Sequence, residues 1–204
     1  MYSIVPLFTA FTVVSIISAY RRRHDKLQKK ANDDFWERES AANSVRRQDI
    51  SGLPYINIPF EIFSIESISD DELEKAANEL ESLRDKKILN LGNQTNTDLK
   101  MQYGPANLPA LMEYDQNFAD MLHAITSYTN RLIELNRIDL AIPALEFCVA
   151  SGSDVTAHYT TLATYYKDNG ASEKLIELKS LAEALDSLMK QPILQKINAI
   201  ETES

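Results

Sequence analysis

The side chains that could support catalysis or metal binding are few and lie far apart in the sequence. The three histidines, His24, His123 and His158, have no cysteine, histidine or carboxylate nearby at the spacing of a recognised metal-binding motif. Each is more typical of a surface or helix-packing position. The sequence therefore predicts no metal site and no cofactor.

Other reactive patterns are equally weak. The single cysteine, Cys148, has no disulfide partner within these 204 residues and falls in an apolar helical stretch, where a buried position is expected. The five glycines form no phosphate-binding loop, and no G-x-S-x-G motif is present. Glu72, Glu74, Glu79 and Glu81 could act as an acid and a base, although an acidic helix face is usually just solvated. We therefore expect no enzymatic activity and no small-molecule substrate.

Charge is distributed unevenly along the chain, whose net charge is −9. Residues 21–30 hold six basic and one acidic side chain, and residues 1–20 hold none, which leaves −14 on residues 31–204. An acidic domain repels the phosphate backbone, so we expect no nucleic-acid binding. Roughly 170 residues follow the N-terminal segment, enough for one domain with its own core.

The most apolar stretch is Tyr2–Tyr20, which contains no charged residue. At about 1.5 Å per residue, a helix of this length just crosses a hydrocarbon core of roughly 30 Å. A cleaved signal peptide would carry its basic residues before the apolar run. A buried core helix would be apolar on one stripe, and an interfacial helix would need a charged face. We interpret residues 1–20 as a transmembrane anchor.

Basic residues follow the predicted anchor at once. Such residues stay on the cytoplasmic side of a membrane and contact anionic head groups. This predicts a single-pass protein of the cell membrane, with its N-terminus outside and its C-terminal domain in the cytoplasm. The predicted membrane-flanking residues are Arg21, Arg22, Arg23, Lys26, Lys29 and Lys30.

Residues 21–50 are predicted to hold this flank and a juxtamembrane helix over residues 33–47, which acids open and arginines close. Phe35 and Trp36 are adjacent and cannot both face one core. One of them packs on the domain, lies at the membrane interface or contacts a partner. Trp36 is therefore a candidate partner-binding residue.

Residues 51–68 change in character. Pro54 and Pro59 break helices, while the residues around them are β-branched or aromatic. A short edge strand is possible, but no second strand is evident. We expect an extended apolar connector with residues 54–63 packed in a groove of the helical domain. The segment Asp34–Pro59 resembles part of uncharacterised bacterial single-pass membrane proteins, a resemblance that implies no activity.

The segment 69–104 is predicted to contain one helix and one loop. Ser69-Asp70-Asp71-Glu72 fits a capping box with Ser69 at the N-cap, and an apolar stripe extends the helix to about Leu89. Asn90–Gly104 is rich in Asn and Thr and predicts a mobile loop.

The segment 105–204 is predicted to be helical throughout. Turn or cap residues divide it into helices that end near residue 136 and then span 138–151, 154–169, 172–190 and 192–200. Such short connections force antiparallel neighbours.

These helices carry a 34-residue period. Ile125, Thr129, Leu132, Asn136, Ala141 and Cys148 precede Tyr159, Ala163, Tyr166, Gly170, Leu175 and Ala182 by that distance. The alternation of large, small, large and turn residues resembles the tetratricopeptide repeat, in which helical hairpins stack. Thr129, Leu175 and Lys179 depart from the family pattern, and no proline ends either copy.

The resemblance implies a concave surface that binds peptides or other proteins. Tyr159 and Tyr166 fall on repeat core positions, which leaves His158 and Tyr165 as candidate partner-binding residues beside Trp36. The sequence thus predicts an all-α protein, with a transmembrane helix followed by a repeat-like hairpin bundle and an extended connector. We expect a membrane-tethered adaptor for an unidentified protein partner. A structural subunit of a larger membrane assembly and an enzyme without a recognisable motif are the alternatives.

Overall fold

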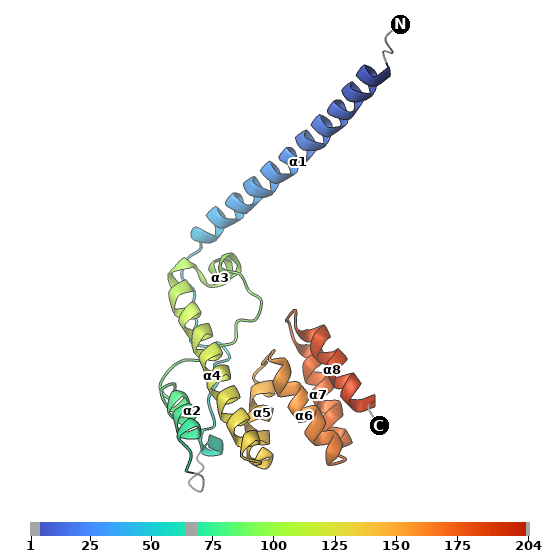
Figure 1. Cartoon of the computed structure of the whole chain (residues 1–204). Helices are drawn as coiled ribbons and strands as arrows, with labels where there is room; N and C mark the ends of the chain where they lie inside the picture. The colour runs from blue at the N-terminus through green and yellow to red at the C-terminus, as the bar shows by residue number, and fades with distance from the viewer. Residues whose placement is uncertain (1–4, 64–68, 203–204) are drawn as a thin grey trace. The chain divides into compact units, whose positions relative to one another are not determined.

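The computed structural model of the chain describes residues 5–63 and 69–202, with side chains from Tyr20 onward except that of Arg22. The described residues are all-α, with eight α-helices, two short 3-10 helices and no β-strand (Figure 1). The all-α part of the predicted fold is therefore confirmed. The chain divides into two compact units. We call Met1–Gln48 with Asn96–Asn107 the stalk unit, and Asp49–Thr95 with Leu108–Ser204 the helical domain.

The stalk unit consists mainly of α1 (Val5–Asn43), a continuous helix of 39 residues. It is about 58 Å long at the rise of an α-helix. It joins the predicted anchor and the predicted juxtamembrane helix into one element. Among the helices that the structure describes, none combines the length and the apolar character needed to cross a bilayer. The predicted anchor starts at Tyr2, and its residues 2–4 lie outside the described range.

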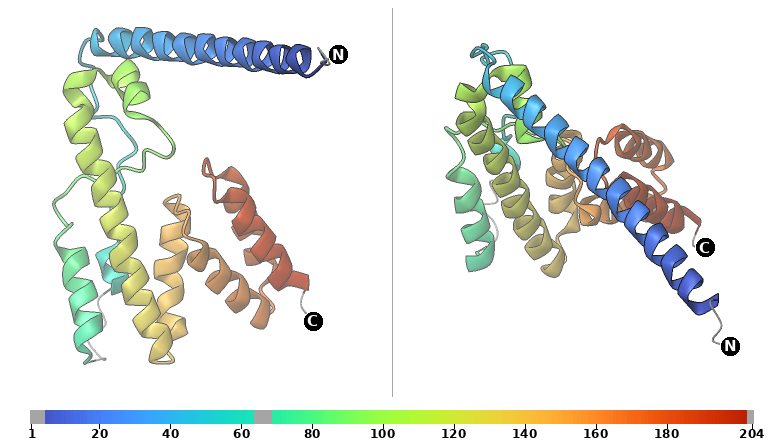
Figure 2. Two further views of the ribbon diagram at one scale, coloured as in Figure 1. Left: turned by 45° about the horizontal axis from the view of Figure 1, so that its top comes forward. Right: turned by 90° about the horizontal axis from the view of Figure 1, so that it is seen from above.

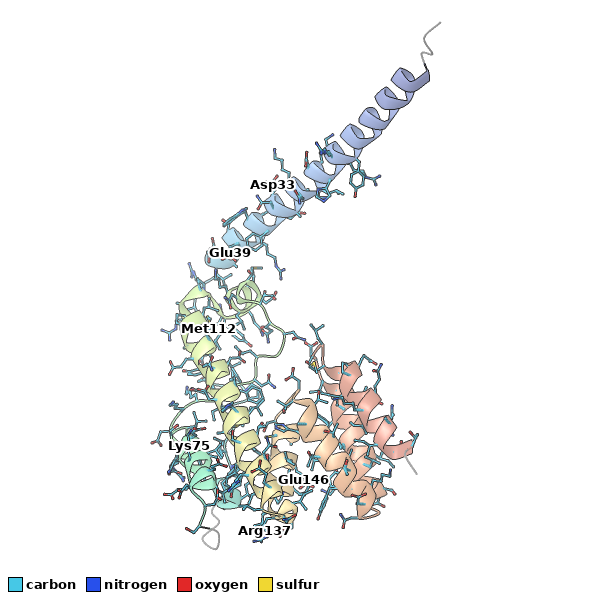
Figure 3. All side chains as sticks on the ribbon, in the orientation of Figure 1. Asp33, Glu39, Lys75, Met112, Arg137 and Glu146 are labelled. Atoms are coloured by element: carbon cyan, nitrogen blue, oxygen red, sulfur yellow. The ribbon has the colours of Figure 1, made fainter. Side chains whose placement is uncertain are left out.

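Every described side chain of α1 from residue 20 to residue 38 is exposed. Figure 3 shows Asp33 on this stretch. Opposite charges recur four residues apart in this stretch, for example Arg21 with Asp25, Lys29 with Asp33, and Asp34 with Arg38. Each such spacing stabilises a helix by about 0.2–0.5 kcal/mol. These spacings favour a helix in a segment that buries almost no apolar surface.

The predicted mobile loop over residues 90–104 is wrong in its second half, which forms α3 (Asn96–Tyr103). This helix packs beside the end of α1 and buries Leu99 and Ala42. The Lys100 ammonium pairs with the carboxylate of Glu39, which also accepts a 2.8 Å hydrogen bond from the Thr97 hydroxyl. The partners that stabilise α3 therefore lie about sixty positions earlier in the chain, where a local sequence pattern cannot show them.

A buried asparagine forms hydrogen bonds with the segment that follows α1. Asn107, in the 3-10 helix η2 (Pro105–Asn107), donates to the carbonyls of Gln48 and Tyr103 at 2.8 and 2.7 Å. Its amide oxygen accepts a 3.0 Å bond from Arg47 Nε. Gly104 precedes η2 with φ +84°, and a Cβ there would lie 2.7 Å from the backbone oxygen of Arg46 in the segment after α1, so glycine is required. The stalk unit is thus held mainly by polar contacts.

The first α-helix of the helical domain is α2 (Asp71–Glu81), which packs beside the long helix α4 (Leu108–Glu134) (Figure 2). The predicted N-cap of α2 is wrong by one residue. The cap is Asp70 rather than Ser69, and its carboxylate accepts from Leu73 N at 3.0 Å. Asp70 also receives two bonds from Arg131 of α4, at 3.0 and 2.6 Å. These guanidinium bonds lower the pKa of Asp70 to about 2.

The helix predicted to reach Leu89 ends at Glu81. A series of tight turns follows, and residues 87–91 then run along α4. Leu89 N donates to the Tyr114 carbonyl at 3.1 Å, and the buried amide of Asn117 donates to the Lys87 carbonyl at 2.9 Å. The apolar residues that suggested a longer helix are buried by these tertiary bonds instead.

The predicted connector packs on the helical domain, as expected. Ile58 and Phe63 are buried in the core, and Ile56 N donates to the Ile88 carbonyl at 2.9 Å. The Arg84 guanidinium lies 3.9 Å from the centroid of the Phe60 ring. The chain is not extended throughout, because Phe60–Phe63 forms the 3-10 helix η1. Predicted connector residues 64–68 lie outside the described range.

Four further helices follow α4, and most agree with the predicted bounds: α5 (Ile138–Ala150), α6 (Thr156–Asp168), α7 (Ser172–Ala184) and α8 (Lys190–Thr202). Helix α7 ends at Ala184 rather than Lys190, because Leu185 takes an extended conformation with ψ 134° and is buried. One core cluster joins η1, α2, α4 and α5, and a second joins α5 to α8.

The turns after α4 and α6 share one geometry at the 34-residue spacing. Asn136 and Gly170 both have positive φ, 58° and 67°. In each turn the next N–H bonds back to the helix at 2.8 Å, from Arg137 to Leu132 and from Ala171 to Tyr166. The apolar positions of both copies are buried. The period seen in the sequence is therefore a repeated helix–turn–helix in the structure.

Candidate functional site

His158, a predicted partner-binding residue, is buried, with only 1% of its surface exposed. Thr126 on α4 donates its hydroxyl to the Leu122 carbonyl at 2.6 Å, so its oxygen accepts from His158 Nε2 at 2.8 Å. His158 Nδ1 accepts from the Ser153 hydroxyl at 2.9 Å, and that hydroxyl accepts from Val155 N. Both ring nitrogens are thus used inside the fold.

This arrangement corrects the prediction of a surface role for His158. Burial lowers the pKa of His158 to about 4, so the ring is neutral at pH 7. A neutral ring with one donor and one acceptor fits the hydrogen-bond chain without a leftover proton. His158 therefore connects α4, the α5–α6 turn and α6, and it presents no surface to a partner.

Tyr165, the second predicted partner residue, is half-buried on α6. Its ring meets the Tyr166 ring edge-on, with centroids 6.2 Å apart. The buried Tyr166 hydroxyl donates to Glu146 at 2.6 Å, and Lys174 donates to the same carboxylate oxygen at 3.0 Å. Burial, with Glu146 second, raises the pKa of Tyr166. Tyr166 is therefore a core residue, as predicted, while Tyr165 keeps a partly exposed edge.

Trp36 lies in the stalk unit and is 60% exposed. The Phe35 ring, also exposed, meets it edge-on with centroids 5.3 Å apart. Two adjacent exposed aromatic rings leave Trp36 available for contact. The predicted flank residues with described side chains are exposed as well: Arg21, Arg23, Lys26, Lys29 and Lys30. The side chain of Arg22 lies outside the described set.

The remaining reactive side chains are separated or neutralised. Cys148 is buried in α5, and burial raises the pKa of its thiol to about 12. Glu81 accepts hydrogen bonds from Arg84, which lowers the pKa of that carboxyl. A carboxylate oxygen of Glu72 lies 3.4 Å from a guanidinium nitrogen of Arg131. Within residues 5–63 and 69–202, no three His, Cys, Asp or Glu side chains gather as metal ligands would.

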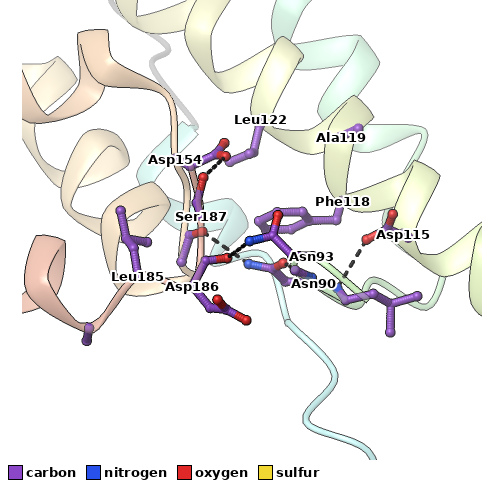
Figure 4. A pocket seen from close by; sticks show the side chains of 14 residues that line it. Asn90, Asn93, Asp115, Phe118, Ala119, Leu122, Asp154, Leu185, Asp186 and Ser187 are labelled. Atoms are coloured by element: carbon purple, nitrogen blue, oxygen red, sulfur yellow. Dashed lines mark hydrogen bonds between the residues drawn. The ribbon is translucent and has the colours of Figure 1, made fainter. Parts of the chain in front are cut away.

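A well-formed concavity of the helical domain lies elsewhere. It has a volume of about 530 Å³ and lies between α4, the loop before α3, the α5–α6 turn and the α7–α8 turn (Figure 4). Its apolar floor is formed by Phe118, Ala119 and Leu122 of α4 together with Leu185. We call this concavity the α4 pocket. The remaining lining residues are Asn90, Leu91, Gly92, Asn93, Asp115, Gly152, Asp154, Ala184, Asp186 and Ser187.

The loop at residues 90–93 forms one wall and is fixed by side-chain hydrogen bonds. Asp115 on α4 accepts from Leu91 N at 3.1 Å. The Asn90 amide donates to the carbonyl of Gly152 at 3.1 Å, and its oxygen accepts from Gly92 N at 2.9 Å. Gly152 has φ +81°, and a Cβ there would lie 2.8 Å from the Asn90 nitrogen. Glycine at this position therefore allows the loop and the α5–α6 turn to meet.

The α7–α8 turn forms the opposite wall. The Ser187 hydroxyl donates to Asp154 at 2.6 Å and accepts from Met189 N at 3.1 Å. The Asn93 amide donates to the Asp186 carbonyl at 2.6 Å, which joins the two walls (Figure 4). The Asn93 side chain thus links two segments that lie ninety-three positions apart in the sequence.

The charge of the α4 pocket is of one sign. Its lining includes Asp115, Asp154 and Asp186, and none of the described lining residues is Lys, Arg or His. Each aspartate comes from a different segment of the chain. The sequence analysis does not predict this site. Its lining residues come from four separate segments, among them the loop at residues 90–93 and residues 184–187, which the sequence assigned to a helix.

Comparisons of the chain with protein-family models, with curated proteins and with solved structures found no match in any of the three.

Proposed function

We propose that this chain is a membrane-tethered adaptor whose helical domain binds a protein partner on the cytoplasmic side of the cell membrane. The observation that supports it most is the α4 pocket, an apolar-floored concavity about 530 Å³ in volume on a domain of stacked helical hairpins. Paired helices that leave a concave face are the architecture with which helical-repeat proteins bind peptides. The likeness to the tetratricopeptide repeat is part of this proposal.

The tether rests on the sequence. The charge-free run Tyr2–Tyr20 and the basic residues that follow it are typical of a single-pass anchor with a cytoplasmic C-terminus. Beyond the anchor, the exposed helical stretch of α1 would act as a spacer. Its charged surface needs no packing partner, because opposite charges are spaced four residues apart along it.

Two measurements on the full-length chain test the proposal. The tether predicts that the chain remains in the membrane fraction through an alkaline wash, and that deletion of residues 2–20 releases it into the supernatant. Binding is tested by co-purification in detergent with Ala119→Arg, which places a long side chain in the α4 pocket from an exposed helix position.

Ala199→Arg is the matched control, since Ala199 is also an exposed helical alanine, on α8, but does not line the α4 pocket. Proteins that co-purify with the parent chain and with Ala199→Arg should be lost from Ala119→Arg. Equal recovery with both variants would show that the α4 pocket is not the docking site.

The alternative is a structural subunit of a larger membrane assembly, which the exposed Phe35 and Trp36 pair on α1 favours. In that case partners would bind through the stalk unit. Phe35→Ser with Trp36→Ser would then remove every co-purifying protein, while Ala119→Arg would remove none.

A further inference from the structure

We propose that the α4 pocket binds an extended basic segment of the partner protein, with an Arg or Lys side chain between Asp154 and Asp186 and an apolar side chain on Phe118 and Leu122. This inference rests on the proposed function and adds the chemistry of the ligand. It is carried by the size of the concavity, its floor and the sign of its charge.

The size suits a short peptide. A volume of about 530 Å³ falls within the range of roughly 300–1,000 Å³ found for pockets that bind small ligands. The walls are fixed by the Asn93–Asp186 and Ser187–Asp154 hydrogen bonds, so the concavity exists before a ligand arrives. A site that is already formed loses little conformational entropy on binding.

The floor selects an apolar group. Phe118, Leu122 and Leu185 belong to the core but still line the α4 pocket, each with less than a tenth of its surface exposed. Ala119 between them is exposed and leaves room above the helix. An apolar side chain seated there would remove water from both surfaces, at about 25 cal/mol for each Å² of apolar area buried.

The charge selects the basic group. Asp115, Asp154 and Asp186 enter the concavity from three segments, and no described lining residue supplies a positive charge. Asp115 is half-buried and accepts from the Leu91 N–H, whereas Asp154 and Asp186 are exposed, so these two are the better partners for a cation. Asp154 accepts the Ser187 hydrogen bond through one of its two carboxylate oxygens. Residues 31–204 carry −14 in total, which would attract a basic segment at a distance as well.

Other ligand classes fit less well. An acidic peptide or a nucleic acid would be repelled by the three aspartates. A metal ion needs several oxygen ligands at one point, and no group of three acidic, His or Cys side chains gathers in this way among the described residues. A basic and apolar peptide satisfies both the floor and the walls.

The test uses the full-length chain in detergent and a short fluorescent peptide, capped at both ends, with two arginines around a central leucine. A second peptide replaces both arginines with glutamate. Fluorescence anisotropy should show binding of the arginine peptide only. The variant Asp154→Asn with Asp186→Asn should weaken its Kd roughly five- to tenfold, since two partly screened charge pairs are lost. Asparagine at position 154 can still accept the Ser187 hydrogen bond.

Asp168→Asn with Glu173→Gln is the matched control, because it removes the same net charge from exposed positions outside the α4 pocket. It should leave the Kd within about twofold, and the thermal midpoint of each variant checks its fold. Salt at about 0.5 M, where the Debye length is roughly 4 Å, should weaken binding of the arginine peptide. The inference is overturned if neither peptide binds, if both bind alike, or if the two double variants behave alike.

Failure of this inference can be separated from failure of the proposed function. If Ala119→Arg removes the co-purifying proteins while Asp154→Asn with Asp186→Asn leaves them bound, the α4 pocket is a docking site for a ligand of other chemistry. If neither variant affects them, the proposed docking site is wrong as well.

Discussion

Different kinds of contact stabilise the interior of the helical domain and the interior of the stalk unit. The helical domain buries two clusters of apolar side chains, among them Ile125, Leu162 and Ile193, which are fully buried. In the stalk unit, α3 is fixed to the end of α1 by the Glu39–Lys100 ion pair and by the amide of Asn107. The stability that apolar burial contributes depends on how well side chains fill the core, and it changes little with salt. The stability that polar contacts contribute to the stalk unit depends on a few specific bonds.

Because of this difference, we expect the stability of one unit to change without a change in the other. A domain with an apolar core unfolds as a unit, while a segment held by a few hydrogen bonds can open locally at lower cost. We therefore expect substitutions in the helical domain to lower its global stability, and substitutions in the stalk unit to act on α3 and residues 44–48 alone.

The largest effect is expected from a cavity in the helical domain. Leu162→Ala removes a fully buried side chain from the cluster around α6 and should lower the free energy of unfolding by about 4 kcal/mol. Leu188→Ala is the control, because Leu188 is 90% exposed, and it should change stability by less than about 0.5 kcal/mol. Urea unfolding followed by circular dichroism measures both. Equal losses would mean that the apolar core does not dominate this domain.

The second-largest effect is expected at His158, which is hydrogen-bonded on both ring nitrogens inside the helical domain. Burial lowers the pKa of His158 from the ordinary 6.5 to about 4. Between these values the unfolded chain binds a proton that the folded chain does not. Stability should therefore fall as pH drops from about 6.5 to about 4, by about 3 kcal/mol in all.

Comparison of variants isolates this dependence from that of the carboxylates. His158→Gln should be less stable at pH 7 but should lose this part of the pH dependence, whereas His123→Gln, at an exposed position, should keep it. Urea unfolding at several pH values between 4 and 7 gives the slopes. A slope that His158→Gln leaves unchanged would show that His158 titrates normally in the fold.

The third effect tests the stalk unit. Asn107→Ala removes two donors from the carbonyls of Gln48 and Tyr103 and should cost about 2 kcal/mol locally. Amide hydrogen exchange should accelerate in residues 44–48 and in α3, while the rates in α4 to α8 stay constant. Gln102→Ala, at an exposed position on α3, serves as the control. Faster exchange across the helical domain would mean that the two units are not held independently.

The smallest effect is expected from the ion pair between Arg38 and Asp98, whose side chains are 59% and 36% exposed. Exposed pairs are weakened by solvent and side-chain entropy. Arg38→Ala should therefore change hydrogen exchange in α3 less than Asn107→Ala does. A larger change would show that charge rather than the buried amide fastens α3.

The elements predicted correctly are those whose signals lie within the element. Helices α4, α5 and α6 have an apolar period and end at turn residues, and Asn136 and Gly170 mark equivalent turns. These signals are local, so the sequence shows them. The repeat followed from the same residues, and the repeated turn geometry agrees with it.

The elements predicted wrongly are those whose partners are distant in the sequence. Helix α3 pairs with Glu39, and the N-cap of α2, Asp70, is also bound by Arg131 of α4. His158 faces Thr126, thirty-two positions earlier, so its burial could not be seen from its neighbours. The α4 pocket is the extreme case, since four segments that are distant in the sequence meet there and none of them indicates a pocket by itself.

A photoreactive residue at position 119 in living cells tests the central claim most directly. Ala119 lines the α4 pocket, and Ala199, exposed on α8, is the matched position outside it. We expect one discrete crosslinked adduct in the membrane fraction from position 119, none from position 199, and loss of the adduct in the Asp154→Asn with Asp186→Asn background. The absence of an adduct, or the same adducts from both positions in a soluble fraction, would contradict the claim.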